Sequence, residues 1–282
     1  MPHKLRTIAI IQARMSSTRL PGKVLTDIGG QPMLVRVVER TRRARLLEDV
    51  VVATTVEASD SPIVDFCAEH GYPCYRGDLD DVLDRYYQAA LNFGAEVIVR
   101  ITADCPVMDA GIVDRVIRIL REPENGTPQV DFSASRLPPP WGRSLPIGLD
   151  VEVVTFAALE RAWKEADQPF QREHVMPFFY EGIPAEALRP NDALPTSHEP
   201  WYVLSDTSPR GFRVAQLHHR PDYGLLRWTV DTPQDLDLLR LIYAAFDNQD
   251  DFTWRDVLAL FERQPELAAI NADVVHKTVY EK

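Results

Sequence analysis

The feature that most constrains the fold of this chain is an alternation of short β-branched runs with amphipathic segments of helical length over residues 7–120. The β-branched runs predict four buried strands, at 7–12, 50–54, 73–75 and 96–101. The intervening segments predict helices at 32–44, 60–70, 80–92 and 109–120. Strands that alternate with helices of this length form right-handed βαβ units, which place the strands in a parallel sheet. We therefore expect an α/β fold with a mostly parallel, twisted sheet and helices on both faces.

The regular alternation ends after residue 121, where Pro and Gly become frequent up to residue 148 and again over 190–209. The remaining predicted elements are strands at 150–154, 212–217 and 226–230 and helices at 155–166, 170–181 and 233–246. We expect one α/β domain over residues 1–247, with an excursion at about 131–210 that carries acceptor or dimer contacts. Residues 248–282 are expected to form a C-terminal helical packing segment, with a helix at 252–262.

The composition excludes several classes of protein. The chain has 31 Lys and Arg residues and 42 Asp and Glu residues, a formal charge of −11, whereas general binding of nucleic acid or anionic membranes needs a basic surface. Its longest apolar runs are far shorter than the roughly 20 residues that span a bilayer, and the N-terminus shows no signal-peptide core. Cys67, Cys74 and Cys105 form no CxxC motif, so we expect a protein of the reducing cytoplasm.

The loop after the first predicted strand is basic, although the chain as a whole is acidic. No Asp or Glu precedes Asp27, and residues 12–23 contain Arg14, Arg19 and Lys23 among Ser, Thr and a Pro-Gly turn. Hydroxyl groups, a closely approaching backbone and three cations suit a polyphosphate. Ligands of open α/β sheets bind at the carboxyl ends of the strands, where this loop begins. We therefore predict a triphosphate site here, with a solvated basic loop as the simpler alternative.

The loop matches neither of two common phosphate-binding motifs. A Walker A motif needs Gly at position 17 and Ser or Thr at position 24, where this chain has Ser17 and Val24. The Gly29-Gly30 pair lacks the spacing of the dinucleotide-binding G-x-G-x-x-G motif. The triphosphate site is thus predicted from charge and position alone.

Two aspartates that follow predicted strands are candidate magnesium ligands. Asp104 follows the fourth predicted strand, with Pro106 stiffening the turn, and Asp231 follows the last one. Carboxylate oxygens in such positions suit a Mg²⁺ ion that substrate phosphates also hold. Helix capping is the alternative: it fits Asp109 better than Asp104, whereas for Asp231 the two interpretations are equally supported.

Six segments in order along the chain resemble the cytidylyltransferase family, which includes the CMP-Kdo and CMP-sialic acid synthetases. The resemblance is closest to the spore-coat polysaccharide biosynthesis branch of that family. The segments are Ile-Ile-Gln-Ala-Arg-Met-Ser-Ser-Thr-Arg-Leu-Pro-Gly-Lys (10–23), Tyr-Arg-Gly-Asp (75–78) with Asp-Val-Leu-Asp-Arg-Tyr (81–86), Arg-Ile-Thr-Ala-Asp-Cys-Pro (100–106), Pro-Ile-Gly-Leu-Asp-Val-Glu-Val (146–153), Arg-Glu-His-Val (172–175) and Thr-Val-Asp-Thr-Pro-Gln-Asp (229–235). They span most of the first 235 residues, so the match is specific as a set.

This resemblance implies a Rossmann-like α/β fold of the nucleotidyltransferase type. It implies an enzyme that couples a nucleoside triphosphate, usually CTP, to a sugar acid or related acceptor and releases pyrophosphate, with Mg²⁺ as cofactor. The implied process is surface polysaccharide biosynthesis. Members of the family are commonly homodimers, and residues 146–153 would lie near that interface.

Carried over position by position, the resemblance assigns roles to individual residues. Catalysis would depend on Lys23, Arg14, Asp104 and Asp231, and the two aspartates would bind the metal. The nucleotide would contact Ala13, Arg14, Ser16, Arg19, Lys23, Arg76 and Thr102. The acceptor would contact Asp84, Arg85, Asp150, Glu152 and His174.

Two other functions remain open at this point. A nucleotide-sugar glycosyltransferase usually has two carboxylates one residue apart at its metal strand. Asp104 has no such partner. Asp78 and Asp80 have this spacing, but they follow only a very short predicted strand. A non-catalytic nucleotide-binding module has less need of the predicted metal ligands, and pyrophosphate release would distinguish it from an enzyme.

A few conspicuous residues are interpreted without a functional role. His218 and His219 follow an apolar run and are interpreted as a surface pair rather than as a metal site. Trp201, Trp228 and Trp254 are expected in the core or at an interface.

Overall fold

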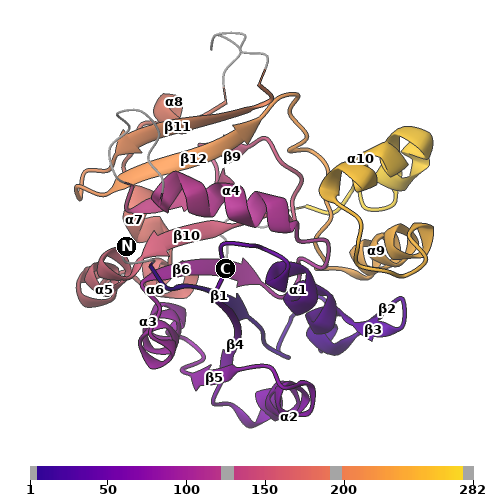
Figure 1. The fold of residues 1–282 in the computed structure, drawn as a ribbon, viewed down its shortest axis with the longest axis horizontal. Helices are drawn as coiled ribbons and strands as arrows, with labels where there is room; N and C mark the ends of the chain where they lie inside the picture. The colour runs from indigo at the N-terminus through magenta and orange to yellow at the C-terminus, as the bar shows by residue number, and fades with distance from the viewer. Residues whose placement is uncertain (1–4, 122–129, 191–198, 276–282) are drawn as a thin grey trace.

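The computed structural model describes residues 5–121, 130–190 and 199–275. An eight-stranded sheet runs through the molecule (Figure 1). In their order across the sheet, its strands are β11 (Trp201–Thr207), β12 (Arg213–His219), β7 (Phe132–Ala134), β10 (Glu152–Thr155), β6 (Val97–Thr102), β1 (Thr7–Gln12), β4 (Asp49–Thr55) and β5 (Cys74–Gly77). Two short hairpins lie outside it, formed by β2 (Asp27–Ile28) with β3 (Gln31–Pro32) and by β8 (Arg136–Leu137) with β9 (Gly142–Arg143).

Helices cover both faces of the sheet. The α-helices are α1 (Met33–Arg42), α2 (Ser61–His70), α3 (Val82–Phe93), α4 (Ala110–Arg121), α5 (Phe156–Glu165), α6 (Pro169–His174), α7 (Pro177–Tyr180), α8 (Ala185–Leu188), α9 (Pro233–Ala245) and α10 (Trp254–Arg263). Short 3-10 helices are present at Lys23–Leu25, Ala58–Asp60 and Pro265–Ala269.

The first half of the chain folds as its alternation predicts. Every strand and helix expected over residues 7–120 is present, with ends shifted by at most two residues. β5, β4, β1 and β6 are parallel neighbours, whereas β10 runs antiparallel between β6 and β7. Four of the seven strand pairings are parallel, which confirms the predicted α/β fold with a mostly parallel sheet.

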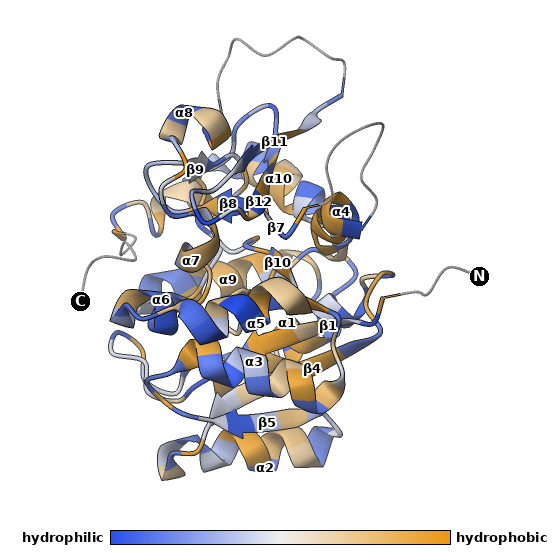
Figure 2. Ribbon diagram, turned by 90° about the vertical axis from the view of Figure 1, so that its left-hand side faces the viewer, coloured by the Kyte–Doolittle hydropathy of each residue, from blue (hydrophilic) through white to orange (hydrophobic). Residues whose placement is uncertain are grey.

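The single strand β1 supplies side chains to two hydrophobic cores. Ala9 and Ile11 belong to the cluster that includes apolar residues of α1, α4, α9 and α10. Ile8 and Ile10 belong to the cluster of α3, α5 and α7 on the other face. Successive side chains of a strand point to opposite faces, so one uninterrupted apolar run serves both clusters. Figure 2 shows β1 and β4 as largely hydrophobic strands between the helices.

Two predictions for the second half of the chain are wrong, one of a helix and one of a strand. The helix predicted at 170–181 is interrupted between α6 and α7, where Val175 has a φ of 68° and Pro177 has no N–H to continue the helix. The segment predicted as a strand at 226–230 is extended but joins no sheet. It forms an isolated bridge with Ile147 and bonds to two loops, because Trp228 N donates to Ile147 O at 2.7 Å and Val230 N to Asp104 O at 2.9 Å.

Two strands of the eight-stranded sheet, β7 and β11, occur where the sequence predicts irregular structure, as does the β8–β9 hairpin. β7 has only three residues, too few to show a periodic pattern. β11 lies at the edge of the sheet and alternates half-buried with exposed residues, several of them polar. Their neighbour β12 ends in His218 and His219, which are both buried, so the prediction of a surface pair is wrong. Trp228 and Trp254 are buried in the core as predicted.

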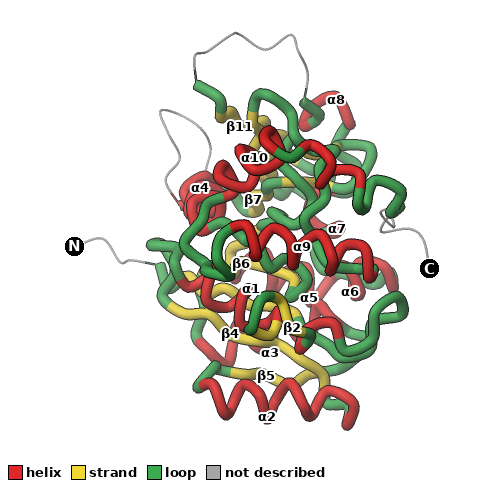
Figure 3. Tube along the Cα trace, turned by 90° about the vertical axis from the view of Figure 1, so that its right-hand side faces the viewer, coloured by secondary structure: helices red, strands yellow, loops and turns green. Residues whose placement is uncertain are grey.

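The later part of the chain is built onto this sheet. The predicted excursion at 131–210 contributes β7 and β10 to the sheet interior, and its residues 191–198 lie outside the described residues. The helix predicted at 252–262 is α10, which lies beside α9 (Figure 3). Both helices join the core of one sheet face. Residues 276–282 are outside the described part. Among the described residues, no helix has the length and apolar character needed to cross a membrane.

Candidate active site

A buried carboxylate fixes the basic loop between β1 and α1. Asp60, at the start of α2, accepts a hydrogen bond from Met15 N at 2.7 Å and another from Thr55 Oγ1 at 2.5 Å. Met15 O in turn accepts the N–H groups of Ser17 and Gly22, both at 2.9 Å. These four bonds tie the loop to the end of β4 and close it on itself.

The same loop leaves hydrogen-bond donors for a ligand. Within the described residues, the backbone N–H groups of Thr18 and Arg19 have no acceptor, although both residues line the adjacent cleft. Successive unpaired N–H groups form concavities that bind anions. The loop therefore offers backbone donors as well as the side-chain cations that its sequence predicts.

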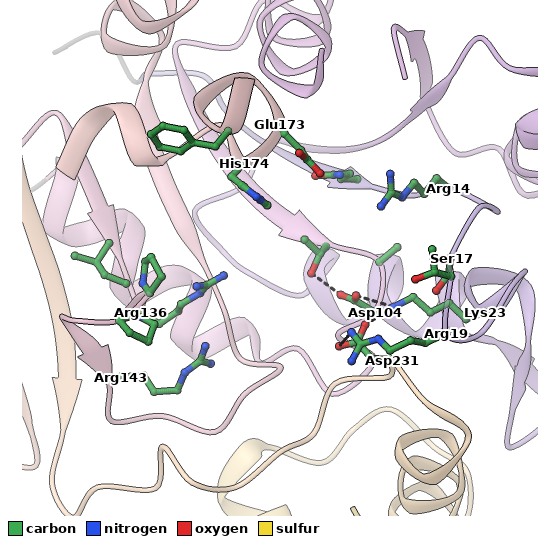
Figure 4. A pocket seen from close by; sticks show the side chains of 18 of the residues that line it. Arg14, Ser17, Arg19, Lys23, Asp104, Arg136, Arg143, Glu173, His174 and Asp231 are labelled. Carbon is green, nitrogen blue, oxygen red and sulfur yellow. Dashed lines mark hydrogen bonds and ion pairs between the residues drawn. The ribbon is translucent and has the colours of Figure 1, made fainter. Parts of the chain in front are cut away.

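A cleft of about 810 Å³ opens beside this loop at the carboxyl ends of β1 and β6 (Figure 4). The basic loop forms one wall, and the β8–β9 hairpin with α6 forms the opposite wall. Asp104 and Asp231 lie at the base of the loop wall. The charged residues that line the cleft are Arg14, Arg19, Lys23, Asp104 and Asp231 on the loop side and Arg136, Arg143, Glu173 and His174 on the other side.

Lys23 joins the two aspartates that the sequence places 127 positions apart. Its Nζ atom lies 2.9 Å from Asp104 Oδ2 and 2.8 Å from Asp231 Oδ1, and it also donates to Val230 O at 2.7 Å. Thr102 Oγ1 donates to the other oxygen of Asp104 at 2.6 Å. Arg19 and Arg227 approach Asp231 Oδ2 at 3.0 and 2.8 Å. The structure thus brings together the two aspartates that the family resemblance assigns to one metal.

The charges of this cluster keep each other ionised. Burial alone would raise the pKa of Asp231, but the charges of Lys23 and Arg19 and hydrogen bonds from Lys23 and Arg227 lower it to about 2. Burial likewise opposes ionisation of Asp104, and Lys23 is the main cause that lowers its pKa. The pKa of Lys23 is raised, because the two aspartates outweigh its burial. At neutral pH the cluster therefore holds two carboxylates and an ammonium group.

This donor set fits a magnesium ion held jointly with a substrate. Among the described residues, no group of three or more His, Cys, Asp or Glu side chains could hold a metal by itself. Mg²⁺, however, usually binds through one or two carboxylates together with waters and substrate phosphates. Asp104 and Asp231 are ionised, face the cleft and lie beside the cations that a phosphate needs, so they could supply the protein's share of such a site.

The wall opposite the loop contains two arginines that the sequence analysis did not single out. Arg143 Nη1 lies 2.7 Å from Asp150 Oδ1, and Arg136 Nε lies 3.4 Å from Asp150 Oδ2. Asp150, a predicted acceptor residue, thus lies behind these arginines and does not itself line the cleft. His174 does line it, from the end of α6. The available sequence signal was a Pro-rich turn at 138–142 with an arginine on each side.

Several other predicted contacts lie outside the cleft lining. Ala13 is buried behind the loop, and Ser16 is exposed on it. The remaining four bind the scaffold: Arg76 donates to Thr55 O and Glu57 O, Asp84 accepts from Trp163 Nε1, Arg85 donates to Asp78 O and Leu79 O, and Glu152 pairs with Arg100. The family-like segments at 75–86 therefore position structural elements around the cleft.

The carboxylate pair considered for a glycosyltransferase is also outside the cleft. Asp78 Oδ1 accepts the backbone N–H groups of Asp80 and Asp81 at 2.8 and 3.0 Å. Asp78 thus stabilises the turn before α3, and neither it nor Asp80 lines the cleft. The two aspartates found in the cleft, Asp104 and Asp231, do not have the spacing of that alternative.

Comparison with known families decides between the remaining interpretations. Residues 8–213 match the sequence model of a protein family that is described as cytidylyltransferase. This range includes the basic loop and Asp104. The chain belongs to the cytidylyltransferase family. The resemblance inferred from six segments is confirmed, and the protein is a nucleotidyltransferase.

Cytidylyltransferases and their relatives match this chain over most of its length. It is 27% identical over 264 residues to the spore coat polysaccharide biosynthesis protein SpsF of Bacillus subtilis, covering 92% of this chain and 95% of that protein. It is 31% identical over 276 residues to 3-deoxy-manno-octulosonate cytidylyltransferase of Mesorhizobium japonicum, covering 84% of this chain and 99% of that protein. A solved cytidylyltransferase structure from Leptospira borgpetersenii aligns with a TM-score of 0.78 at 26% identity, covering 96% of this chain and 100% of that chain.

Proposed function

We propose that this cytidylyltransferase transfers cytidine monophosphate from CTP to a sugar acid or a related acceptor, with Mg²⁺ as cofactor and with release of pyrophosphate. The observation that carries the proposal is the contact of Lys23 with both Asp104 and Asp231. A metal-bound triphosphate requires cations for its phosphates and carboxylates for its metal at one place. Both are present in one cleft, next to a loop with free backbone donors.

The proposed reaction is an in-line substitution at the α-phosphorus of CTP. An acceptor oxygen forms the new bond to the α-phosphorus, and the bond from that phosphorus to the oxygen that bridges to the β-phosphorus breaks. Pyrophosphate leaves with the electron pair of the broken bond, and a hydroxyl acceptor releases its proton to water. Arg14, Arg19 and Lys23 would stabilise the charge on the departing pyrophosphate. Mg²⁺, when held by Asp104 and Asp231, would neutralise phosphate oxygens.

Binding of CTP and Mg²⁺ should be interdependent. Lys23 and Arg19 neutralise Asp104 and Asp231 in the ligand-free chain. When the triphosphate binds Lys23 and Arg19, the partly buried carboxylates of Asp104 and Asp231 lose these positive partners. Two partly buried negative charges without a positive partner are unfavourable. A divalent cation restores the balance, so each ligand should increase the affinity for the other.

The wall opposite the loop favours an acceptor with a negative charge. Arg136 and Arg143 share the single carboxylate Asp150, so this group carries one excess positive charge. Glu173 lies apart from the two arginines (Figure 4). Arginine binds carboxylates and phosphates through its fork of N–H groups. The named activity of the Mesorhizobium relative and the process in the name of the Bacillus relative agree with a sugar acid used in surface polysaccharide biosynthesis.

Pyrophosphate release tests the proposal directly. The purified protein is incubated with CTP, Mg²⁺ and a panel of 3-deoxy sugar acids, and pyrophosphate is quantified. Lys23→Ala should lower turnover by roughly two to three orders of magnitude, because it removes a cation that stabilises the negative charge of the departing pyrophosphate. Lys164→Ala, a matched change at an exposed lysine of α5, should leave turnover unchanged. Near-normal turnover of a folded Lys23→Ala protein would contradict the proposal, as would an absence of pyrophosphate with every acceptor.

A further inference from the structure

A buried network behind the cleft connects Asp231 to the C-terminal part of the chain. Its centre is Asp235 on the first turn of α9, a carboxylate with 0% exposure. Asp235 Oδ2 accepts the backbone N–H groups of Asp231 and Thr232 at 3.0 and 2.9 Å. This oxygen also accepts from Thr232 Oγ1 at 3.0 Å. The contacts of Oδ2 cap the helix and at the same time fix the backbone of Asp231.

The other oxygen of Asp235 has partners that helix capping does not require. Asp235 Oδ1 accepts from Arg227 Nε at 2.9 Å and from Asn271 Nδ2 at 2.8 Å. Arg227 uses its Nη2 atom to donate to Asp231 Oδ2 at 2.8 Å. Arg227 is therefore held between two carboxylates, and its position fixes the direction of the Asp231 carboxylate as well.

Asn271 closes this network from a distant part of the sequence. Its side-chain amide donates to Asp235 Oδ1 and also to Arg227 O at 3.1 Å, and the residue is only 4% exposed. It follows α10, which lies beside α9 (Figure 3), and the 3-10 helix Pro265–Ala269, which contacts α10. The segment after residue 247 thus contributes a polar side chain, that of Asn271, to the network that holds Asp231, the candidate metal ligand. Its contribution is not limited to apolar packing.

We propose that Asp235, Arg227 and Asn271 are positioning residues for Asp231, and that the C-terminal segment is thereby a working part of the metal–triphosphate site. This inference deepens the proposed function and rests on its assignment of Asp231 as a metal ligand. Residues that orient a metal ligand without touching the metal typically change metal affinity or activity by 10- to 100-fold when they are substituted. A residue that only packs the terminal helices would lower stability without changing metal affinity.

Asn271→Leu tests this inference at the outer end of the network. Leucine has nearly the same size but donates no hydrogen bond, whereas substitution of the fully buried Asp235 could prevent folding. Mn²⁺ binding in the presence of CTP is measured by electron paramagnetic resonance for the full-length protein. We expect Asn271→Leu to bind Mn²⁺ about tenfold more weakly than the wild type. Its rate of pyrophosphate release should recover as the Mg²⁺ concentration is raised.

Thr253→Ala is the matched structural control. It removes the N-cap of α10 and destabilises the same segment without touching the network. It should lower the unfolding temperature by about 3 °C and leave Mn²⁺ affinity unchanged. Equal Mn²⁺ affinity in wild type and Asn271→Leu would overturn the inference alone, as would an equal loss in Thr253→Ala. A wild type that binds CTP but no Mn²⁺ with it would overturn the metal assignment and this inference with it.

Discussion

The charges around Lys23 are balanced residue by residue. Lys23, Arg19 and Arg227 face Asp104, Asp231 and Asp235, which makes three cations against three carboxylates. Removing one member of a buried ion pair is more costly than the pair is stabilising, because the remaining charge stays desolvated. The ligand-free cluster is therefore stable by itself, and substrate and metal must bind by replacing its internal ion pairs.

Arg143→Ala tests the acceptor side of the cleft separately from the nucleotide side. Without Arg143, Asp150 has only Arg136 as its partner, so the excess positive charge of that wall is lost. We expect KM for the sugar-acid acceptor to rise at least about tenfold, which corresponds to 1.4 kcal/mol. KM for CTP should not change. Steady-state kinetics with each substrate varied in turn measures both effects.

Arg45→Ala provides the control for this substitution. Arg45 is exposed, and its side chain does not line the cleft. Both kinetic constants should remain at their wild-type values. A rise in KM for CTP with unchanged acceptor KM in Arg143→Ala would assign that arginine to the nucleotide instead.

Single residues of the site differed in how well the sequence predicted them. Asp104 and Asp231 could be predicted to lie in the cleft because each is a charged residue just after a strand or an extended segment. Lys23 could be predicted because it ends a basic loop in an acidic chain. The role of Asp60 could not be predicted, because Met15, whose N–H it accepts, lies 45 positions away and only the fold brings the two together. Asp84 and Arg85 show the converse limit: similarity to a family segment does not tell whether a residue contacts substrate or holds the scaffold.

At the scale of elements, the basic loop depends on its anchor on α2. Asp60→Ala removes the acceptor for Met15 N and for Thr55 Oγ1, and buried donors without a partner cost about 1–3 kcal/mol. The loop should lose its fixed shape, so we expect KM for CTP to rise roughly tenfold at little change in acceptor KM. The comparison is with Asp65→Ala, an exposed aspartate of α2. A drop in stability with unchanged KM for CTP would reduce Asp60 to a purely structural role.

Strand β12 contains a buried histidine that should make the fold sensitive to acid. Burial lowers the pKa of His218 from 6.5 to about 4. Between these pH values the unfolded chain binds a proton that the folded chain does not. The free energy of unfolding should therefore fall as pH falls, by up to about 1.4 kcal/mol per unit.

Urea unfolding at pH 7 and pH 5 measures this effect. His218→Gln keeps an amide donor for Leu188 O, which His218 Nε2 contacts at 3.0 Å, but it does not titrate. Its stability should therefore decrease less between the two pH values than that of the wild type. His70→Gln, at an exposed position, should behave like the wild type. Equal acid sensitivity of His218→Gln and wild type would rule out this histidine as its source.

The elements of the first half were more predictable than those of the second half for a physical reason. Strands β1, β4 and β6 are largely buried on both faces, so each contains an uninterrupted run of three or four apolar residues that stands out in the sequence. β11 is an edge strand and mixes polar with apolar residues. The extended segment at 226–230 resembles a buried strand because Trp228 and Val230 are in the core. Its backbone partners are loops, which no local pattern can reveal.

At the scale of the whole molecule, the candidate site assembles segments from both ends of the chain. Lys23 comes from the first loop, Asp104 from the end of β6 and Asp231 from the entry to α9, while Asn271 supports the last of these. The sequence predicted the sheet that brings the first two together. The contribution of the C-terminal segment was not predictable, since it depends on the packing of α9 against α10 and on one buried amide.

Thermal unfolding with nucleotides tests most directly whether the cleft is a magnesium–triphosphate site. The protein is unfolded with CTP, UTP, ATP and GTP in turn, each with and without Mg²⁺, and the series is repeated for Asp104→Asn. A ligand at 100 times its dissociation constant adds about 2.7 kcal/mol, a shift on the order of 5 °C. We predict that CTP produces such a shift when Mg²⁺ is present and not without it. In Asp104→Asn the shift should be lost. No shift with any triphosphate, or an equal shift in Asp104→Asn, would contradict the assignment of the cleft.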